Sequence, residues 1–322
     1  MPLRAVSAAD LELLISDLRR STPEPRHGIF GPASANWQVN RESALFVAAG
    51  RAALLQLAHP WVAAAIAQHS RTLNDPIGRF HQTFRVMFAI SFGPLEQAFS
   101  AARRLHRLHE TIRGTLPDAV GRFPSGSSYQ ANDVDALAWV FATLIDSSLL
   151  AYDLVLPPLS RDEHEQYYRE YRRSSALFGV PPDEFPPDLV GFERYMESAL
   201  RSDMLGASAS TRQLAHRLHA GAGLLVPIPY WYRALTTHLL PPRFREEFQF
   251  DYSERERESA ERALRWIRKV FPLLPAALRY VGPYHEAVAR LEGRPPGGIA
   301  RISNRIWIGQ PRLFADERHS VA

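Results

Sequence analysis

The chain has 322 residues, 46% of them hydrophobic and 22% charged, a composition typical of a globular protein with a sizeable core. It contains no cysteine, which excludes disulfide bonds, iron–sulfur clusters, a haem held by a cysteine thiolate and a haem attached covalently through cysteine. The net charge of +4 comes almost wholly from arginine, and no basic run is interleaved with aromatic residues. We therefore expect a solvated basic surface rather than a nucleic-acid interface.

The N-terminal segment, residues 1–29, predicts one amphipathic helix followed by a loop rich in proline and glycine. Asp10, Glu12 and Asp17 recur through the helix. This pattern is unlike a signal peptide or a membrane anchor, so we expect a cytoplasmic protein.

Residues 41–70 form a largely apolar run that His59 and Pro60 divide into two predicted helices. The run is long enough to suggest a membrane span, but Arg51 and His59 favour helices buried inside a soluble protein. His59 and His69 are candidates for the wall of a pocket, with a structural place or a position at the rim as the favoured interpretation.

A further helix is predicted from Asp75, which can cap it, to the break at Gly93-Pro94. Arg79 and Thr83 lie one turn apart at the edge of its apolar face. That apolar face consists of Ile77, Phe80, Phe84 and Met87. Two polar side chains beside an apolar surface mark this helix as the first place to look for chemistry.

The next helix is predicted over residues 95–113, with Gly114 as its C-terminal cap. His109 occupies a core position on its apolar stripe, and His106 lies at the edge of that stripe. Ala102 keeps the stripe shallow, so that a flat group could lie against the helix. A lone histidine on an apolar face is more often a hydrogen-bonded core residue than a ligand, and both interpretations stay open at this point.

Residues 132–152 are apolar nearly all round the helical wheel and predict a helix in the middle of the core. Asp146 lies within this helix and would be costly to bury unpaired, so we expect an arginine or histidine partner. Arg79 is one candidate partner for Asp146. A hydrogen bond from the His109 ring to the Asp146 carboxylate is the other possibility.

The remaining chain predicts further helices, two of which begin with capping boxes at Ser160 and Ser253. Residues 293–322 predict an irregular tail. No strand-like alternation, glycine-rich phosphate loop or nucleophile elbow is present. The sequence therefore predicts a single all-α domain of about ten to twelve helices over residues 30–292.

Four segments resemble the MpaB/rubber oxygenase family, in an order and spacing that cover roughly residues 30–290. They are QLAHPWVAAAIAQHS from Gln56, DPIGRFHQT from Asp75, HETIRG from His109 and YQANDVDALAWVFATLIDSSLLAY from Tyr129. The resemblance implies helices packed in a globin-like manner around a pocket for haem b, whose iron one histidine binds.

The resemblance also implies roles for particular residues. His109 matches the proximal iron ligand, in the pattern H-x-x-[IV]-x-G. Arg79 and Thr83 match the distal arginine and threonine of the rubber oxygenases, which donate hydrogen bonds to dioxygen. Gln82 stands where those enzymes have a lysine, and Lys269 is the single lysine of the chain. A distal lysine is therefore not expected here.

We expect His106, Phe80 and Ala102 to contact the haem as well. The function implied by the resemblance is oxidative cleavage of a carbon–carbon double bond by O₂ in a hydrophobic substrate, an isoprenoid or another alkene. The expected partners are that substrate and O₂, with neither nucleic acid nor stable membrane insertion. The alternatives are a haem-binding sensor or carrier without turnover, and a helical protein without a cofactor.

Overall fold

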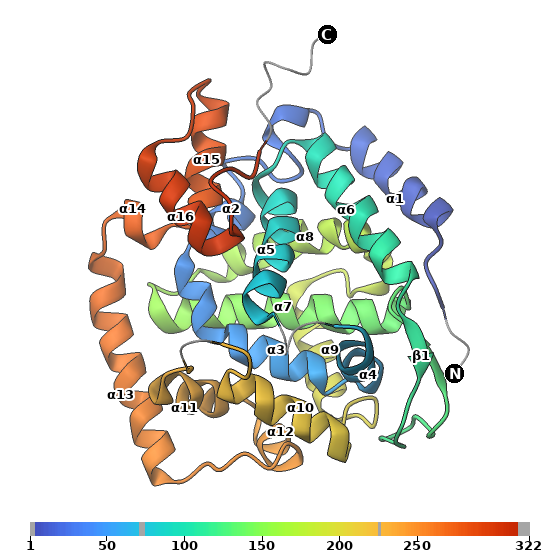
Figure 1. Cartoon of the computed structure of the whole chain (residues 1–322). Helices are drawn as coiled ribbons and strands as arrows, with labels where there is room; N and C mark the ends of the chain where they lie inside the picture. Colours follow the sequence, from blue (N-terminus) through green and yellow to red (C-terminus); the bar gives the residue numbers. More distant parts are fainter. Residues whose placement is uncertain (1–3, 71–74, 225–226, 315–322) are drawn as a thin grey trace.

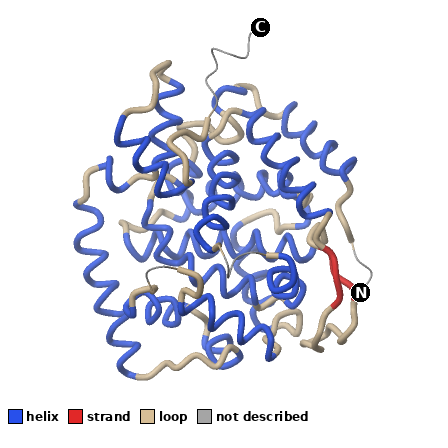
Figure 2. The backbone as a smooth tube through the Cα atoms, viewed as in Figure 1, coloured by secondary structure: helices blue, strands red, loops and turns tan. Residues whose placement is uncertain are grey.

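The computed structural model describes residues 4–70, 75–224 and 227–314, which fold into helices around one core (Figure 1). The described residues form sixteen α-helices and one two-stranded ribbon (Figure 2). The predicted all-α class is confirmed. The number of helices exceeds the prediction. One reason is that short helices such as α12 (Pro242–Glu247) and α14 (Ala276–Arg279) are too short to show a hydrophobic periodicity in the sequence.

The elements of the first half of the chain are α1 (Ala8–Arg20), α2 (Ala35–Asn40), α3 (Ala49–Leu57), α4 (Pro60–His69), α5 (Pro76–Phe92), α6 (Leu95–Glu110), β1 (Arg113–Thr115), β2 (Ser128–Gln130) and α7 (Val134–Val155). Those of the second half are α8 (Arg161–Ser174), α9 (Leu189–Arg201), α10 (Ala209–Ala220), α11 (Tyr230–Leu239), α12 (Pro242–Glu247), α13 (Glu254–Val270), α14 (Ala276–Arg279), α15 (Gly282–Leu291) and α16 (Gly298–Ile308). Short 3₁₀ helices occupy Pro25–His27, Ser43–Ala48, Ser175–Phe178, Pro182–Glu184 and Phe271–Leu273.

Helix α7 runs through the middle of the molecule (Figure 1). This position is predicted by the apolar residues on nearly all sides of the helix. Trp139 and Ile145 are fully buried, and the Trp139 indole donates a hydrogen bond to the Leu55 carbonyl of α3. Among the described helices, α7 alone has the length and composition to cross a membrane, yet 67% of its most apolar stretch is buried within the fold. Its apolar character thus suits the centre of a helical core.

The predicted helix starts are confirmed by their caps. Asp75 accepts a hydrogen bond from the Gly78 amide at 2.8 Å, with Pro76 in the first turn of α5. Ser160 and Ser253 form the two capping boxes with Glu163 and Glu256. These local signals depend on few residues, which is why the sequence alone reveals them.

Helices α5 and α6 form an antiparallel hairpin around Gly93 and Pro94. Gly28 packs against this turn with a φ of 76°, and a side chain at Gly28 would overlap the Gly93 carbonyl oxygen. The loop before α2 thereby fixes the closed end of the hairpin.

The predicted C-terminal end of α6 is wrong. Helix α6 ends at Glu110, not at residue 113, because the chain turns at Thr111 into β1, which pairs with β2 in an antiparallel ribbon. Gly114 therefore lies in a strand, where a Cβ atom would come within 2.6 Å of the Gln68 side chain and 2.8 Å of the Tyr129 hydroxyl. A close approach of neighbouring segments, not a helix cap, requires glycine at this position.

The tail predicted to be irregular contains α16, which packs on α5 and α15. Ala300, Asn304 and Ile308 face inward at helical spacing, whereas the glycines and prolines ahead of them suggest a loop. At the other end of the chain, Leu11 and Ile15 of α1 join the same core as α7. The segments flanking residues 30–292 are thus packed parts of the fold.

Candidate functional site

Arg79 and His109 both lie at the ends of α5 and α6 that are remote from the connecting turn. Arg79 precedes the turn by almost as many residues as His109 follows it. The positive charge of Arg79 helps to lower the pKa of His109, so the two side chains are close enough for their charges to interact. The resemblance assigns these two residues to opposite sides of a haem.

His109 is a neutral imidazole at physiological pH. Burial, with a smaller contribution from the charge of Arg79, lowers its pKa to about 4. Its side chain is nevertheless only half-buried, because the apolar stripe of α6 leaves the core at this point. Its ring makes no hydrogen bond to another described residue. Histidine binds a metal through a ring nitrogen that is unprotonated and not already engaged in a hydrogen bond, and the neutral His109 ring can offer such a nitrogen.

Arg79 is an unpaired cation. Burial lowers the pKa of its guanidinium, although the group stays charged at any physiological pH. Within the described part of the chain, no carboxylate pairs with Arg79 and no acceptor receives a hydrogen bond from its guanidinium. A partly buried cation without a partner favours an anionic or electron-rich ligand beside it.

The other two predicted catalytic residues lie on the exposed side of α5. The Thr83 hydroxyl is bonded to the Arg79 carbonyl at 3.0 Å, one turn back along its own helix. Gln82 is exposed, and within the described structure it makes no hydrogen bond to Arg79 or His109. Their roles as distal residues stay predictions.

His106 has a different environment from His109. It is 5% exposed, and its Nε2 lies 3.0 Å from the Val6 carbonyl of the N-terminal segment. The backbone carbonyl of His106 also accepts a hydrogen bond from Asn132. The ring thus fastens α6 to the segment before α1, which leaves His109 as the better placed ligand on this helix.

Phe80 is half-buried and Ala102 is buried, and their predicted contacts with a haem stay predictions. The Phe80 ring belongs to an aromatic cluster with Phe46, Phe84 and Trp307, at centroid distances of 5.8, 4.5 and 6.3 Å respectively. Ala102 is fully buried among core side chains. The contribution of Phe46 and Trp307 was not predicted, since Trp307 lies in the supposed tail.

Asp146 has the arginine partner that its burial requires, but that partner is Arg51 of α3. The two groups approach to 2.6 Å, and Arg51 also donates to Ser147 Oγ at 2.7 Å and to the Leu239 carbonyl at 3.0 Å. The prediction of an Arg79–Asp146 pair is therefore wrong, and among the described residues no bond joins Asp146 to His109. Arg51 lies nearer to Asp146 because α3 packs directly along α7.

His59 is completely buried between the rings of Trp61 and Phe123, with centroids at 5.8 and 5.5 Å. Burial lowers its pKa to about 3, and neither ring nitrogen has a hydrogen-bond partner in the described structure. His69, by contrast, is exposed and bonds the Arg113 carbonyl through Nε2 at 3.0 Å. His69 is thus a surface residue that holds β1 against α4, and its place at the rim of a pocket stays a prediction.

The described residues contain no group of three or more histidine, aspartate or glutamate side chains that could hold a metal ion by themselves. A haem needs only one protein ligand for its iron, because the porphyrin supplies the other four nitrogens. His109, neutral and without a hydrogen-bond partner, suits that single position, and Arg79 offers the charge that a haem propionate or an oxygen ligand would pair with. The donor set therefore fits a haem.

The fold and the site define a predominantly helical protein in which a histidine and an arginine without a partner among the described residues lie at the ends of a helical hairpin remote from its turn. Residues 37–269 match the family described as "ER-bound oxygenase mpaB/B'/Rubber oxygenase, catalytic domain". The chain belongs to this mpaB/rubber oxygenase family, as the resemblance implies.

Two curated relatives, both described as uncharacterized proteins, come from Mycobacterium bovis and Mycobacterium tuberculosis. Each is 26% identical to this chain over 175 residues, which is 52% of this chain and 64% of the relative. The match thus spans slightly less than two thirds of the length of these relatives. No solved structure matches the chain.

Proposed function

We propose that the protein is a haem b-dependent oxygenase that acts on a hydrophobic substrate. The observation that carries this proposal is that a neutral His109 and the cation Arg79, neither with a side-chain partner among the described residues, lie within electrostatic reach of each other at the ends of α5 and α6 remote from the turn. Membership of an oxygenase family supports the reaction class. We further propose a cytoplasmic location and O₂-dependent cleavage of a carbon–carbon double bond, as the resemblance implies.

A bound haem would supply an iron centre that activates O₂, and the chain would supply the rest. His109 would hold the iron, because its lowered pKa keeps the imidazole unprotonated well below neutral pH. Arg79 would keep a fixed positive charge beside the reacting oxygen atoms, where a partly desolvated cation acts more strongly than it does in water.

The substrate class follows from the surface of α5. Phe80, Phe84 and Met87 follow Arg79 along one side of this helix, and all three are half-buried. Apolar surface of this kind favours an alkene or isoprenoid over a charged molecule. We therefore propose a hydrophobic alkene as the substrate.

The test is the visible spectrum of protein purified from cells supplied with a haem precursor, followed by a pyridine haemochrome assay. We expect a Soret band and about one haem b per chain. His109→Ala should abolish haem retention. His106→Gln is the matched control on the same helix, and it should keep the haem, because His106 bonds the Val6 carbonyl.

Arg79→Met should keep the haem and lower O₂-dependent product formation on an alkene, because it removes charge without removing the iron ligand. A haem-loaded protein that turns over none of a panel of alkenes would point to a sensor or carrier. A colourless protein that also fails to take up added haem would refute the cofactor and with it the proposed function. Full haem content in His109→Ala would refute the assignment of the ligand.

A further inference from the structure

Helix α16 presents an apolar stripe away from the body of the protein. Ile299, Ile302 and Ile306 recur at helical spacing and are 58, 61 and 64% exposed. Ala300 and Ile308 of the same helix are buried against the body. Three large aliphatic side chains on one outward stripe exceed the scattered exposure that is normal for a protein surface.

Arginines flank this stripe on one side. By helical geometry, Arg301 and Arg305 lie between the isoleucine stripe and the buried side of α16. Both are exposed, and neither guanidinium is paired or hydrogen-bonded to another described residue. Residues 293–314 contain four arginines and no acidic residue. Arg294 is paired with Glu292, so the positive charge near the apolar stripe comes from Arg301, Arg305 and Arg312.

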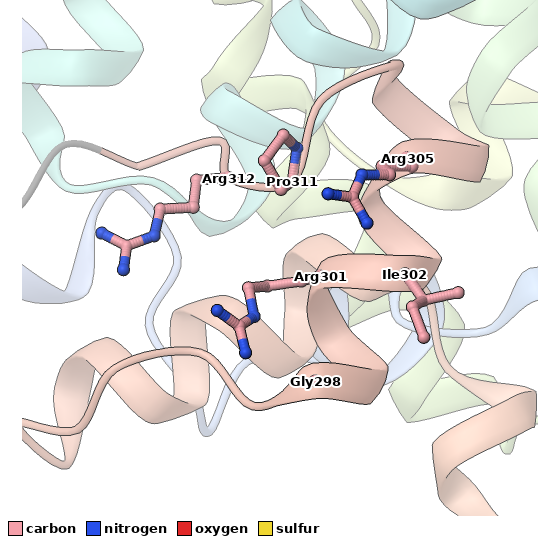
Figure 3. Close-up of a pocket in the computed structure, with 6 residues that line it drawn as sticks. All are labelled: Gly298, Arg301, Ile302, Arg305, Pro311 and Arg312. Carbon is pink, nitrogen blue, oxygen red and sulfur yellow. The ribbon is translucent and has the colours of Figure 1, made fainter.

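A hollow of about 400 Å³ opens beside the stripe, lined by Gly298, Arg301, Ile302, Arg305, Pro311 and Arg312. Figure 3 shows the three arginines gathered around Pro311, with Ile302 pointing away from them. The hollow could receive an anionic headgroup while the isoleucines enter an apolar phase. The aliphatic side chains thus lie farthest from the body of the protein, and the cations lie closer to it. An amphipathic helix that lies in a membrane interface has the same arrangement.

We propose that α16 docks the protein onto a bilayer surface that contains anionic phospholipids. The isoleucine stripe enters the boundary between headgroups and acyl chains, and Arg301 and Arg305 contact phosphates. A second copy of the chain fits this face less well, because an antiparallel two-fold contact through the isoleucines would bring the arginines of both copies together. The proposal does not depend on a cofactor.

The docking face is coupled to the helix that carries Arg79. The Ile306 and Ile308 carbonyls at the end of α16 accept hydrogen bonds from His81 Nε2 and Arg85 Nε of α5, at 3.1 and 2.9 Å. Trp307, from the same turn, packs on Phe46 at a centroid distance of 4.2 Å. A bilayer bound at α16 would therefore lie one helix away from the candidate site.

The test is co-sedimentation of the full chain with two kinds of vesicle, one of phosphatidylcholine alone and one of phosphatidylcholine mixed with phosphatidylglycerol. We expect binding to the mixed vesicles, weaker binding at high salt, and little binding to phosphatidylcholine alone. Replacing both arginines by glutamine should weaken binding to the mixed vesicles roughly fivefold for each arginine.

The variant with Ile302→Ser and Ile306→Ser should weaken binding roughly tenfold or more. Leu13→Ser is the matched control, because Leu13 is 68% exposed on α1, near Asp10, Glu12 and Asp17. It should leave binding unchanged. Circular dichroism and the thermal midpoint check that each variant is folded.

Three outcomes would overturn the proposal. The first is failure of the native chain to bind mixed vesicles. The second is undiminished binding by the arginine and isoleucine variants. The third is a dimer in light scattering that the Ile302→Ser and Ile306→Ser variant dissociates, without any vesicle binding, which would make this face a contact between copies.

Discussion

Two histidines, His59 and His109, have pKa values far below the ordinary value because burial disfavours their charged forms. The consequence differs between them. His109 is half-buried and can reach a ligand, whereas His59 is enclosed by Trp61 and Phe123. Both lowered pKa values make the fold less stable in acid, and in His109 the lowered pKa also keeps the ring neutral for binding.

Replacing His59 by phenylalanine should make the protein less sensitive to acid. The unfolded chain protonates this histidine near pH 6.5 and the folded chain only near pH 3, so its contribution to stability falls as the pH drops through that window. The slope is roughly 1.4 kcal/mol per pH unit at most. Urea unfolding between pH 6.5 and 4 should therefore give a flatter curve for His59→Phe than for the native chain.

His27→Gln is the control for this measurement, because His27 is exposed in the loop before α2. Parallel pH curves for His59→Phe and the native chain would contradict the assignment of the acid sensitivity to His59.

Gly114→Ala should destabilise the protein by about 1–3 kcal/mol. The new Cβ would lie within 3 Å of the Gln68 and Tyr129 side chains, which are joined by a hydrogen bond of 2.8 Å. Gly297→Ala, at a position with open space around it, should have a smaller effect. Denaturant unfolding measures both. Adding Gln68→Ala should recover part of the loss, and no recovery would show that the clash lies elsewhere.

At the scale of the helix, the reliable predictions rest on local chemistry. Asp75, Ser160 and Ser253 cap helices where the sequence indicates, and Gly93-Pro94 ends α5. The end of α6 and the existence of α16 were missed, because they depend on a ribbon and on a packing surface formed by distant segments. Propensity near glycine and proline does not reveal such tertiary support.

The Arg51–Asp146 pair should hold α3 to α7 in a way that single substitutions expose. Arg51→Met leaves the half-buried Asp146 carboxylate unpaired in the core, and should lower the free energy of unfolding by about 3 kcal/mol. The double variant Arg51→Met with Asp146→Leu should recover most of this loss, because both charges are then gone. A double-mutant cycle by urea unfolding measures the coupling, and strictly additive losses would contradict it.

At the scale of the molecule, the sequence predicts the class and the location of the candidate site better than the partners of its residues. The apolar wheel of α7 and the positions of Arg79 and His109 follow from periodicity and from the resemblance. That Arg51 and not Arg79 pairs with Asp146 depends on how α3, α5 and α7 pack. Nearest neighbours in sequence carry no information about such contacts.

If His109 binds haem, the cofactor should stabilise the whole fold by mass action. A ligand at a hundredfold excess over its Kd adds about 2.7 kcal/mol to the free energy of unfolding. Differential scanning calorimetry should therefore show a higher Tm with haem than without it for the native chain, and no such difference for His109→Ala. An equal rise of Tm in both proteins would mean that haem binds elsewhere.

The packing of Gly28 against Gly93 lies at the turn that sets the angle between α5 and α6. Arg79 and His109 lie near the other ends of these helices, about 20 Å from the turn at the rise of an α-helix. A change of about 5° in the angle between the helices would move Arg79 by about 2 Å relative to His109. Substitutions beside Gly28, far from Arg79 and His109 in both sequence and space, should therefore change the distance between these two residues.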